Sequence, residues 1–221
     1  MPAKNTIRIF VKDGIYHVYN RGVEKRKIFL DEQDYRIFIY YLKIYLTAPD
    51  IRSDSPQIVL RLGQEFDLYK NVELMCYALM PNHFHFLVKQ ISEDAITELM
   101  RRLTNAYVKY FNDKYDRVGT LFQGRYKAIL VDEDKYLTHL SSYIHINPIE
   151  IQEFSDPEKL KKYIFSSYLD YIGKRDTPWI HRNFILNYFE ENKFSDYEEQ
   201  TKRLIFASDK YKEKFGSLLL D

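Results

Sequence analysis

Four stretches of the chain have the hydrophobic pattern of β-strands. Residues 14–22 alternate hydrophobic and polar positions and are rich in Tyr and Val, which predicts a first strand. Residues 71–80 and 83–89 are short apolar runs on either side of Pro81-Asn82, which predicts a hairpin of buried strands. Residues 119–131 predict a fourth strand, interrupted at Gly124 by a bulge or a close approach of the backbone.

Three other stretches repeat their hydrophobic residues at helical spacing. Residues 30–46 open with acidic residues, and residues 92–115 open with a capping serine before a long amphipathic pattern. Residues 132–148 also begin with acidic residues and end at Pro148, which stops a helix. Residues 47–64 are rich in turn formers and are expected to form a loop or an insertion with a short helix.

The order of these elements is β-α-β-β-α-β-α, and its first six match the ferredoxin-like pattern. We therefore expect an α+β fold in which an antiparallel sheet has helices packed on one face. Residues 1–150 are expected to form this domain. Residues 151–221 are charged and aromatic with helical patterning, and predict a small helical C-terminal extension.

Two histidines lie two residues apart inside the apolar run of residues 77–90. Side chains alternate between the two faces of a strand, so His83 and His85 point the same way. Such a pair is explained by metal binding, by hydrogen bonding within the core, or by chance. The other histidines add no zinc-type spacing to it, so a metal here needs a third ligand from elsewhere; they are His17, His139, His145 and His181.

A second candidate group lies near the end of the helix predicted at residues 132–148. Tyr143 and Asn147 are four residues apart and share one helix face. A phenol beside an amide oxygen is a suitable arrangement next to a hard metal ion. In a chain with 20 tyrosines the alternative is ordinary packing, with Tyr143 as a core aromatic residue and Asn147 as a helix end before proline.

Composition narrows the possible partners and environment. The net charge is only +1, but residues 21–27 hold four basic residues against one acidic, and residues 100–127 hold seven against two. Two basic zones in a nearly neutral chain fit a partner that is anionic on one side, or else two solvated faces. The single cysteine, Cys76, excludes a disulfide within the chain and a cysteine-based zinc site.

Neither a secretory signal nor a membrane-spanning run is visible in the sequence. The N-terminal stretch MPAKNTIRIF lacks a long apolar segment, and no apolar run approaches the length that spans a bilayer. We therefore expect a cytoplasmic protein with no membrane partner.

In combination the motifs resemble a known family. The order MPNHFHFLV, a basic amphipathic helix, GTLFQGRYKAILV and YLTHLSSYIHINP resembles the REP-associated tyrosine transposases, which belong to the single-tyrosine HUH transposase superfamily. The stretches YHVYNRG and YIFSSYLDYIG are also similar to the family, so the resemblance covers roughly residues 14–173. Residues 177–189 resemble the family more weakly.

The resemblance assigns a role to each candidate residue. It implies that His83 and His85 bind a divalent metal, Mg²⁺ or Mn²⁺, and that Asn147 completes the site. It implies that Tyr143 is the nucleophile of an HUH endonuclease that cleaves single-stranded DNA near hairpins, forms a 5′-phosphotyrosine intermediate and rejoins strands. Tyr107 and Tyr110 on the preceding helix rank below Tyr143. A general base is not evident, with His139 or water as the options.

The resemblance also gives the basic zones a partner, namely single-stranded DNA with REP-like hairpin elements. We expect a nucleoid-associated protein, monomeric or homodimeric. The first alternative is a domesticated protein that binds hairpins without cleaving them. The second is a metal phosphodiesterase that uses water in place of tyrosine. The basic residues expected to contact DNA phosphates are Arg21, Lys25, Arg26, Arg101, Arg102, Lys109, Arg125 and Lys127.

Overall fold

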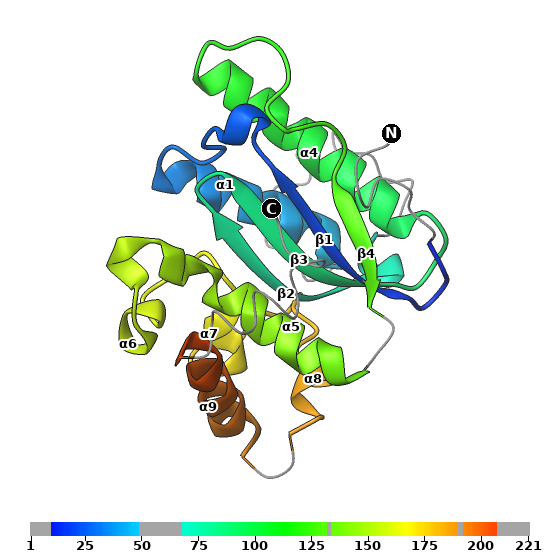
Figure 1. Ribbon diagram of the computed structural model, residues 1–221. Coiled ribbons are helices and arrows are strands. Elements are labelled where there is room, and N and C mark those ends of the chain that lie inside the picture. Colours follow the sequence, from blue (N-terminus) through cyan, green and yellow to red (C-terminus); the bar gives the residue numbers. More distant parts are fainter. Residues whose placement is uncertain (1–9, 49–67, 132–133, 190–191, 207–221) are drawn as a thin grey trace, which may run out of the picture.

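Four antiparallel strands form the sheet in the part of the chain that the structure describes (Figure 1). The computed structural model describes residues 10–48, 68–131, 134–189 and 192–206. The strand order is β2-β3-β1-β4, and each neighbouring pair is antiparallel. The predicted α+β class with an antiparallel sheet is therefore confirmed. The strands are β1 (Ile15–Arg21), β2 (Val72–Met80), β3 (His83–Gln90) and β4 (Lys127–Val131).

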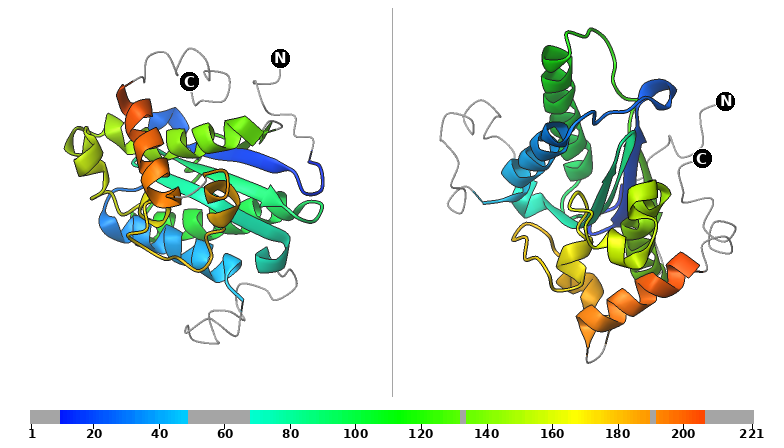
Figure 2. Two further views of the ribbon diagram at one scale, coloured as in Figure 1. Left: turned by 90° about the horizontal axis from the view of Figure 1, so that it is seen from below. Right: turned by 90° about the vertical axis from the view of Figure 1, so that its left-hand side faces the viewer.

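Helices α1 (Glu32–Leu46) and α4 (Ala95–Lys114) cover one face of the sheet, as Figures 1 and 2 show. The even-numbered residues of β3 point to this face, where the Phe84 and Phe86 rings lie 5.5 and 6.2 Å from the ring of Phe38 on α1. Tyr107 of α4 packs edge-on against Phe38 at 4.9 Å. These aromatic contacts form the centre of the core and leave the odd-numbered residues of β3 on the opposite face.

Helix α5 (Asp134–Ile146) lies on that opposite face, together with the C-terminal helices (Figure 2). The expected packing of helices on one face therefore describes α1 and α4, and α5 adds a layer on the other. This placement decides which helix reaches the histidine pair, because His83 and His85 face α5. Helix α5 gives way at Asn147 to the short 3-10 helix η2 (Asn147–Glu150), close to the end predicted at residue 148.

The fourth strand is shorter than predicted. Only residues 127–131 form β4, whereas residues 119–126 fold as an irregular segment beside the end of β1. There Phe122 forms an isolated bridge with Gly22, and the Gln123 amide donates to the Arg21 carbonyl at 2.8 Å. Gly124 has a φ of +69°, a conformation that disfavours most side chains and turns the chain out of the sheet. The predicted interruption at Gly124 thus lies in the irregular segment just before the strand, which begins at Lys127.

The predicted insertion at residues 47–64 lies almost entirely outside the described residues. Before β2 the chain forms the single turn α3 (Leu68–Asn71). After residue 150 the described chain is helical and irregular, as expected. The other helices among the described residues are η1 (Val23–Lys25), η3 (Gln152–Phe154), α6 (Pro157–Leu160), α7 (Tyr168–Tyr171), α8 (Asn183–Leu186) and α9 (Lys193–Phe206).

The C-terminal segment covers the outer edge of β2. The Leu79 amide donates to the Phe165 carbonyl at 3.0 Å, and the Ser167 amide donates to the Tyr77 carbonyl at 2.9 Å. The Tyr171 hydroxyl donates to the Met75 carbonyl at 3.0 Å. Buried residues on both sides of position 150 belong to one hydrophobic cluster. The division of the chain into residues 1–150 and 151–221 stays a prediction.

A buried hydrogen-bond network joins α5 to this C-terminal segment. The two ring nitrogens of His145 lie 2.7 Å from the Tyr197 hydroxyl and 2.7 Å from the Ser167 hydroxyl. Burial lowers the pKa of His145 to about 3, so the ring is neutral at physiological pH.

Within the residues that the structure describes, no helix is long and apolar enough to cross a membrane.

Candidate functional site

His83 and His85 lie side by side on the α5 face of β3, as their spacing predicts. Their ring centroids are 5.0 Å apart and the ring planes are nearly perpendicular. His85 is fully buried, whereas His83 is partly exposed. The two imidazoles therefore share one space between the sheet and α5, with His83 toward solvent.

A third histidine, His17 of β1, supports His85. His17 Nε2 lies 2.8 Å from His85 Nδ1, and the two rings are stacked at 5.1 Å. His17 is fully buried. Its inward position follows from the alternation of residues 14–22, but its partnership with His85 depends on the register between β1 and β3, in which His85 pairs with Tyr19. Sequence reasoning missed this residue.

The contact with His17 determines which atom of His85 is open. One ring nitrogen of His85 is engaged by His17, while His85 Nε2 is buried and has no hydrogen-bond partner among the described residues. Burial, with His83 and His17 nearby, holds the pKa of His85 well below its usual value. A buried, unpaired nitrogen of a neutral imidazole is an atom that can bind a metal ion. A buried polar atom without a partner costs free energy, and a metal ion bound to it would remove that cost.

His83 is held between two amide side chains. Its Nδ1 lies 2.7 Å from the Asn82 side-chain oxygen, and a hydrogen bond with the Asn147 side chain acts to raise its pKa. Burial outweighs this effect and lowers the pKa of His83 to about 4. Near pH 7 the neutral ring carries a single N–H, so it cannot donate to both amide oxygens. A cation that binds the second nitrogen removes this conflict.

Asn147 is oriented by the end of α5. Its Nδ2 donates to the Tyr143 carbonyl at 2.9 Å and to the Ile144 carbonyl at 3.4 Å. These bonds use the nitrogen of the amide and leave the oxygen as the atom that faces His83. The structure thus brings together His83, His85 and Asn147, with an amide oxygen of the kind that hard cations prefer.

Tyr143 lies one turn before Asn147 on α5 and is half-buried against the core. Helix α5 reaches the histidine face within a single chain, where Asn147 at its end forms a hydrogen bond with His83. His139, one turn earlier, lines a cavity against α9 together with Gln200 and Leu204. This helix face is therefore divided between the histidine pair and the C-terminal segment.

The predicted DNA-contacting residues fall into separate places. Arg21 lies at the end of β1, where its Nε donates to the Gln123 side-chain oxygen at 2.5 Å and its charge lowers the pKa of His83. Lys127 lies across the ring of Tyr19 at 5.7 Å, on the same face. Lys25 and Arg26 are exposed at the turn that follows β1.

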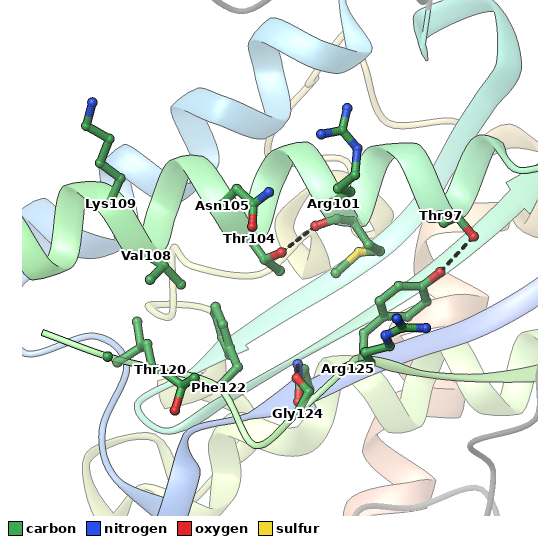
Figure 3. A pocket seen from close by; sticks show the side chains of 15 residues that line it. Thr97, Arg101, Thr104, Asn105, Val108, Lys109, Thr120, Phe122, Gly124 and Arg125 are labelled. Carbon is green, nitrogen blue, oxygen red and sulfur yellow. Dashed lines mark hydrogen bonds between the residues drawn. The ribbon is translucent and has the colours of Figure 1, made fainter.

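The other four basic residues belong to the α4 side of the molecule. Arg101, Lys109 and Arg125 line a groove between α4 and residues 119–126 (Figure 3). Arg102 is largely covered and pairs with Glu98 at 2.5 Å. Glu98 also pairs with Arg101, so ion pairs within one turn of α4 neutralise part of the basic zone that the composition indicates.

Among the described residues, no group of three or more His, Cys, Asp or Glu side chains is arranged to hold a metal ion. A cation at the histidine pair therefore needs the Asn147 oxygen and ligands from water or phosphate. This donor set fits Mg²⁺ or Mn²⁺, which accept oxygen ligands and keep open positions for water or phosphate.

Comparison with known proteins identifies the family. A family model described as "Transposase IS200 like" matches residues 11–147, more than half of the chain. This chain belongs to the IS200-like transposase family. The matched region begins just before β1 and ends at Asn147, so it includes the whole sheet, the histidine pair and α5. The search of curated protein sequences finds no match to this chain.

One solved structure shows the same fold at low sequence identity, and two others have lower TM-scores. A REP-associated tyrosine transposase bound to a REP hairpin has a TM-score of 0.53 and 16% identity over 80% of this chain and 89% of that chain. A Deinococcus radiodurans protein has a TM-score of 0.36 and 16% identity over 63% and 94%. A tRNA(His) guanylyltransferase from Saccharomyces cerevisiae has 0.39 and 10% over 89% and 79%. The likeness to the REP-associated transposase shows that the shared fold extends beyond residues 11–147.

Proposed function

We propose that this transposase-family protein is a metal-dependent enzyme that cleaves single-stranded DNA near hairpins and rejoins the strands. The observation that carries the proposal is the cluster of His83, His85 and Asn147 beneath α5. It combines an open, buried nitrogen with an oriented amide oxygen. A hairpin-binding protein without cleavage has no use for this arrangement. The solved REP-associated transposase bound to a REP hairpin supports a hairpin partner.

Each residue has a chemical role in the proposal. Nε2 of His85, the second nitrogen of His83 and the oxygen of Asn147 would hold Mg²⁺ or Mn²⁺. When bound, the cation would polarise a non-bridging phosphate oxygen and stabilise the charge that develops there. Tyr143 supplies the nucleophile. Its phenol oxygen forms a bond to phosphorus while the bond from phosphorus to the 3′ oxygen breaks.

This reaction leaves the 5′ phosphate on Tyr143, and the phenol proton ends on the free 3′ hydroxyl. Reversal with another 3′ hydroxyl rejoins a strand and regenerates the phenol, so no external energy source is needed. Arg21 and Lys127, which lie on the same face, would hold the flanking phosphates.

The decisive experiment is a test for the covalent intermediate. The protein is incubated with Mn²⁺ and single-stranded oligonucleotides that contain a hairpin, and a protein–DNA band is sought after denaturation. We expect the band with wild type and with Tyr136→Phe, a matched change seven residues earlier on the same helix. We expect no band with Tyr143→Phe or with His83→Ala.

Other outcomes of this experiment would reject the nucleophile or support one of the two alternative functions. A band that persists in Tyr143→Phe excludes this residue as the nucleophile. Cleavage by wild type without any adduct supports a phosphodiesterase that uses water. Hairpin binding with neither cleavage nor adduct supports a domesticated hairpin-binding protein.

A further inference from the structure

The turn between β2 and β3 carries a side chain to which the proposed reaction gives no role. This turn is Pro81-Asn82, and Asn82 directly precedes His83, the first residue of β3. The Asn82 side chain forms two hydrogen bonds. Its oxygen Oδ1 lies 2.7 Å from His83 Nδ1, and its nitrogen Nδ2 donates to the Lys25 carbonyl at 3.3 Å. Asn82 therefore joins the histidine site to the segment of chain that follows β1.

That segment, residues 22–26, is a compact turn. The Gly22 amide donates to the Asn82 carbonyl at 2.8 Å, so both the backbone and the side chain of Asn82 are bonded to the turn. A Cβ at Gly22 would lie 2.2 Å from the Arg26 carbonyl oxygen, so the turn has no room for a side chain there. Lys25 has a φ of +59°, which is uncommon for a residue with a side chain. The turn thus holds the Lys25 carbonyl in a defined place beside Asn82.

The Lys25 carbonyl determines which end of the Asn82 amide faces His83. A carbonyl oxygen only accepts hydrogen bonds, so the amide nitrogen of Asn82 points to it and the amide oxygen points to the histidine. An amide oxygen 2.7 Å from His83 Nδ1 requires a proton on that nitrogen. Because a neutral imidazole has a single N–H, Nε2 of His83 is then left with a free electron pair.

The Asn147 side chain lies against the same histidine ring. Its nitrogen donates to two carbonyls of α5, so its oxygen is the atom that faces His83. Two acceptors that face each other both lack a donor, and a cation between them removes this cost. His85 has the same arrangement, with Nδ1 engaged by His17 and Nε2 open. Both histidines thus present Nε2, and a different side chain supports the Nδ1 of each.

We propose that Asn82 is the positioning residue of His83. Its oxygen holds the ring proton on Nδ1 and so keeps Nε2 free for a divalent cation. The turn of residues 22–26 orients Asn82 through the Lys25 carbonyl. Without the Asn82 oxygen, the proton moves to Nε2, where the Asn147 oxygen accepts it, and this nitrogen can no longer bind a cation. The inference rests on the proposed function in that it takes His83 as a ligand of the cation.

The position of the ring proton can be measured without metal. In nitrogen-15 correlation spectra of histidine rings, a nitrogen that carries a proton is well separated in chemical shift from one that does not. The His83 signals are those lost in His83→Gln. Near neutral pH we expect the His83 proton on Nδ1 in the wild-type protein and on Nε2 in Asn82→Ala. A proton on Nε2 in wild type, or the same tautomer in both proteins, overturns the inference.

Calorimetric titration with Mn²⁺ measures the consequence for metal binding. Loss of a supporting partner usually weakens metal affinity by about 10- to 100-fold, and we expect Asn82→Ala to fall within that range. We expect Asn82→Asp to keep the proton on Nδ1 and to bind Mn²⁺ at least as tightly as wild type. A carboxylate presents an oxygen whichever way it turns, so it needs no orientation by the Lys25 carbonyl.

The aspartate variant also separates positioning from a purely structural role. Both Asn82→Asp and Asn82→Ala lose the hydrogen bond to the Lys25 carbonyl. If Asn82 only stabilised the turn, both variants would therefore lose Mn²⁺ affinity to the same extent. Equal weakening in the two variants overturns the inference. Thermal unfolding without metal confirms that each variant is folded.

The matched control is Asn112→Ala. Asn112 also donates its Nδ2 to a backbone carbonyl, that of Gly119 at 3.0 Å, but it lies on α4, on the other face of the sheet. We expect this variant to bind Mn²⁺ as wild type does and to keep the His83 proton on Nδ1. A loss of affinity equal to that of Asn82→Ala contradicts the positioning role.

The two proposals fail separately. If wild type forms the covalent adduct but carries the His83 proton on Nε2, the positioning role is rejected and the proposed enzyme is kept. If Asn82→Ala moves the proton and weakens Mn²⁺ binding but wild type forms no adduct under any condition, the positioning role is kept and the nuclease is rejected.

Discussion

Removing the ring of His17 tests whether this histidine orients His85. When His85 Nε2 binds a cation, the proton of the neutral ring must lie on Nδ1, and His17 Nε2 is its acceptor at 2.8 Å. The change His17→Phe keeps an aromatic ring in a fully buried position but removes the acceptor. An unpaired buried donor costs about 1–3 kcal/mol.

Since 1.4 kcal/mol is a factor of ten in affinity, this cost corresponds to roughly 5- to 150-fold. The usual effect of losing such a supporting partner is about 10- to 100-fold in metal affinity. We expect His17→Phe to weaken Mn²⁺ binding within that interval. We expect His17→Gln to recover much of the loss, because its amide oxygen can accept the same hydrogen bond.

The assay is calorimetric titration of each folded variant with Mn²⁺, alongside thermal unfolding without metal. The unfolding measurement separates weakened metal binding from loss of the native fold. The partly exposed His181→Gln serves as the control and should bind as wild type does. Wild-type Mn²⁺ affinity in a folded His17→Phe protein would refute the orienting role.

Two further predictions concern α5. We expect Asn147→Ala to weaken both Mn²⁺ binding and the end of the helix, whereas Asn147→Asp keeps an oxygen ligand and loses only the Nδ2 bonds. Calorimetry measures the Mn²⁺ affinity of each variant, and urea unfolding measures its stability. Weak Mn²⁺ binding in both variants contradicts an oxygen-ligand role. The pKa of His145 is about 3 when folded and about 6.5 when unfolded, so the unfolded chain binds more protons and stability falls as pH drops from 6.5 toward 3. The loss in the free energy of unfolding approaches about 1.4 kcal/mol per pH unit. Urea unfolding of His145→Gln at a series of pH values should give a free energy of unfolding whose slope against pH is shallower by up to that amount. A slope equal to that of wild type contradicts a neutral His145.

The sequence predicts those features that depend on local pattern. Alternation places His83 and His85 on one face, and the helical repeat places Tyr143 and Asn147 together, before any contact is known. The long amphipathic pattern of residues 92–115 likewise predicts α4. Each of these depends only on residues that are close in the sequence.

Features that depend on pairing between distant segments were not predictable in the same way. The contact of His17 with His85 requires the register of β1 on β3. The groove requires residues 119–126 to leave the sheet at Gly124 and face α4. The partial neutralisation of the basic zone depends on side-chain geometry, since Glu98 reaches both Arg101 and Arg102.

The cover over the edge of β2 has a consequence for self-association. An open edge strand offers unpaired amide and carbonyl groups to any other strand, including that of a second copy. Here the backbone groups of Tyr77 and Leu79 already bond to residues 165–167, and the Leu74 carbonyl accepts from the His181 amide at 2.8 Å. Two copies cannot join their sheets through β2 unless this segment first detaches. A chain shortened at residue 150 would expose that edge, and with it a route to strand exchange and aggregation.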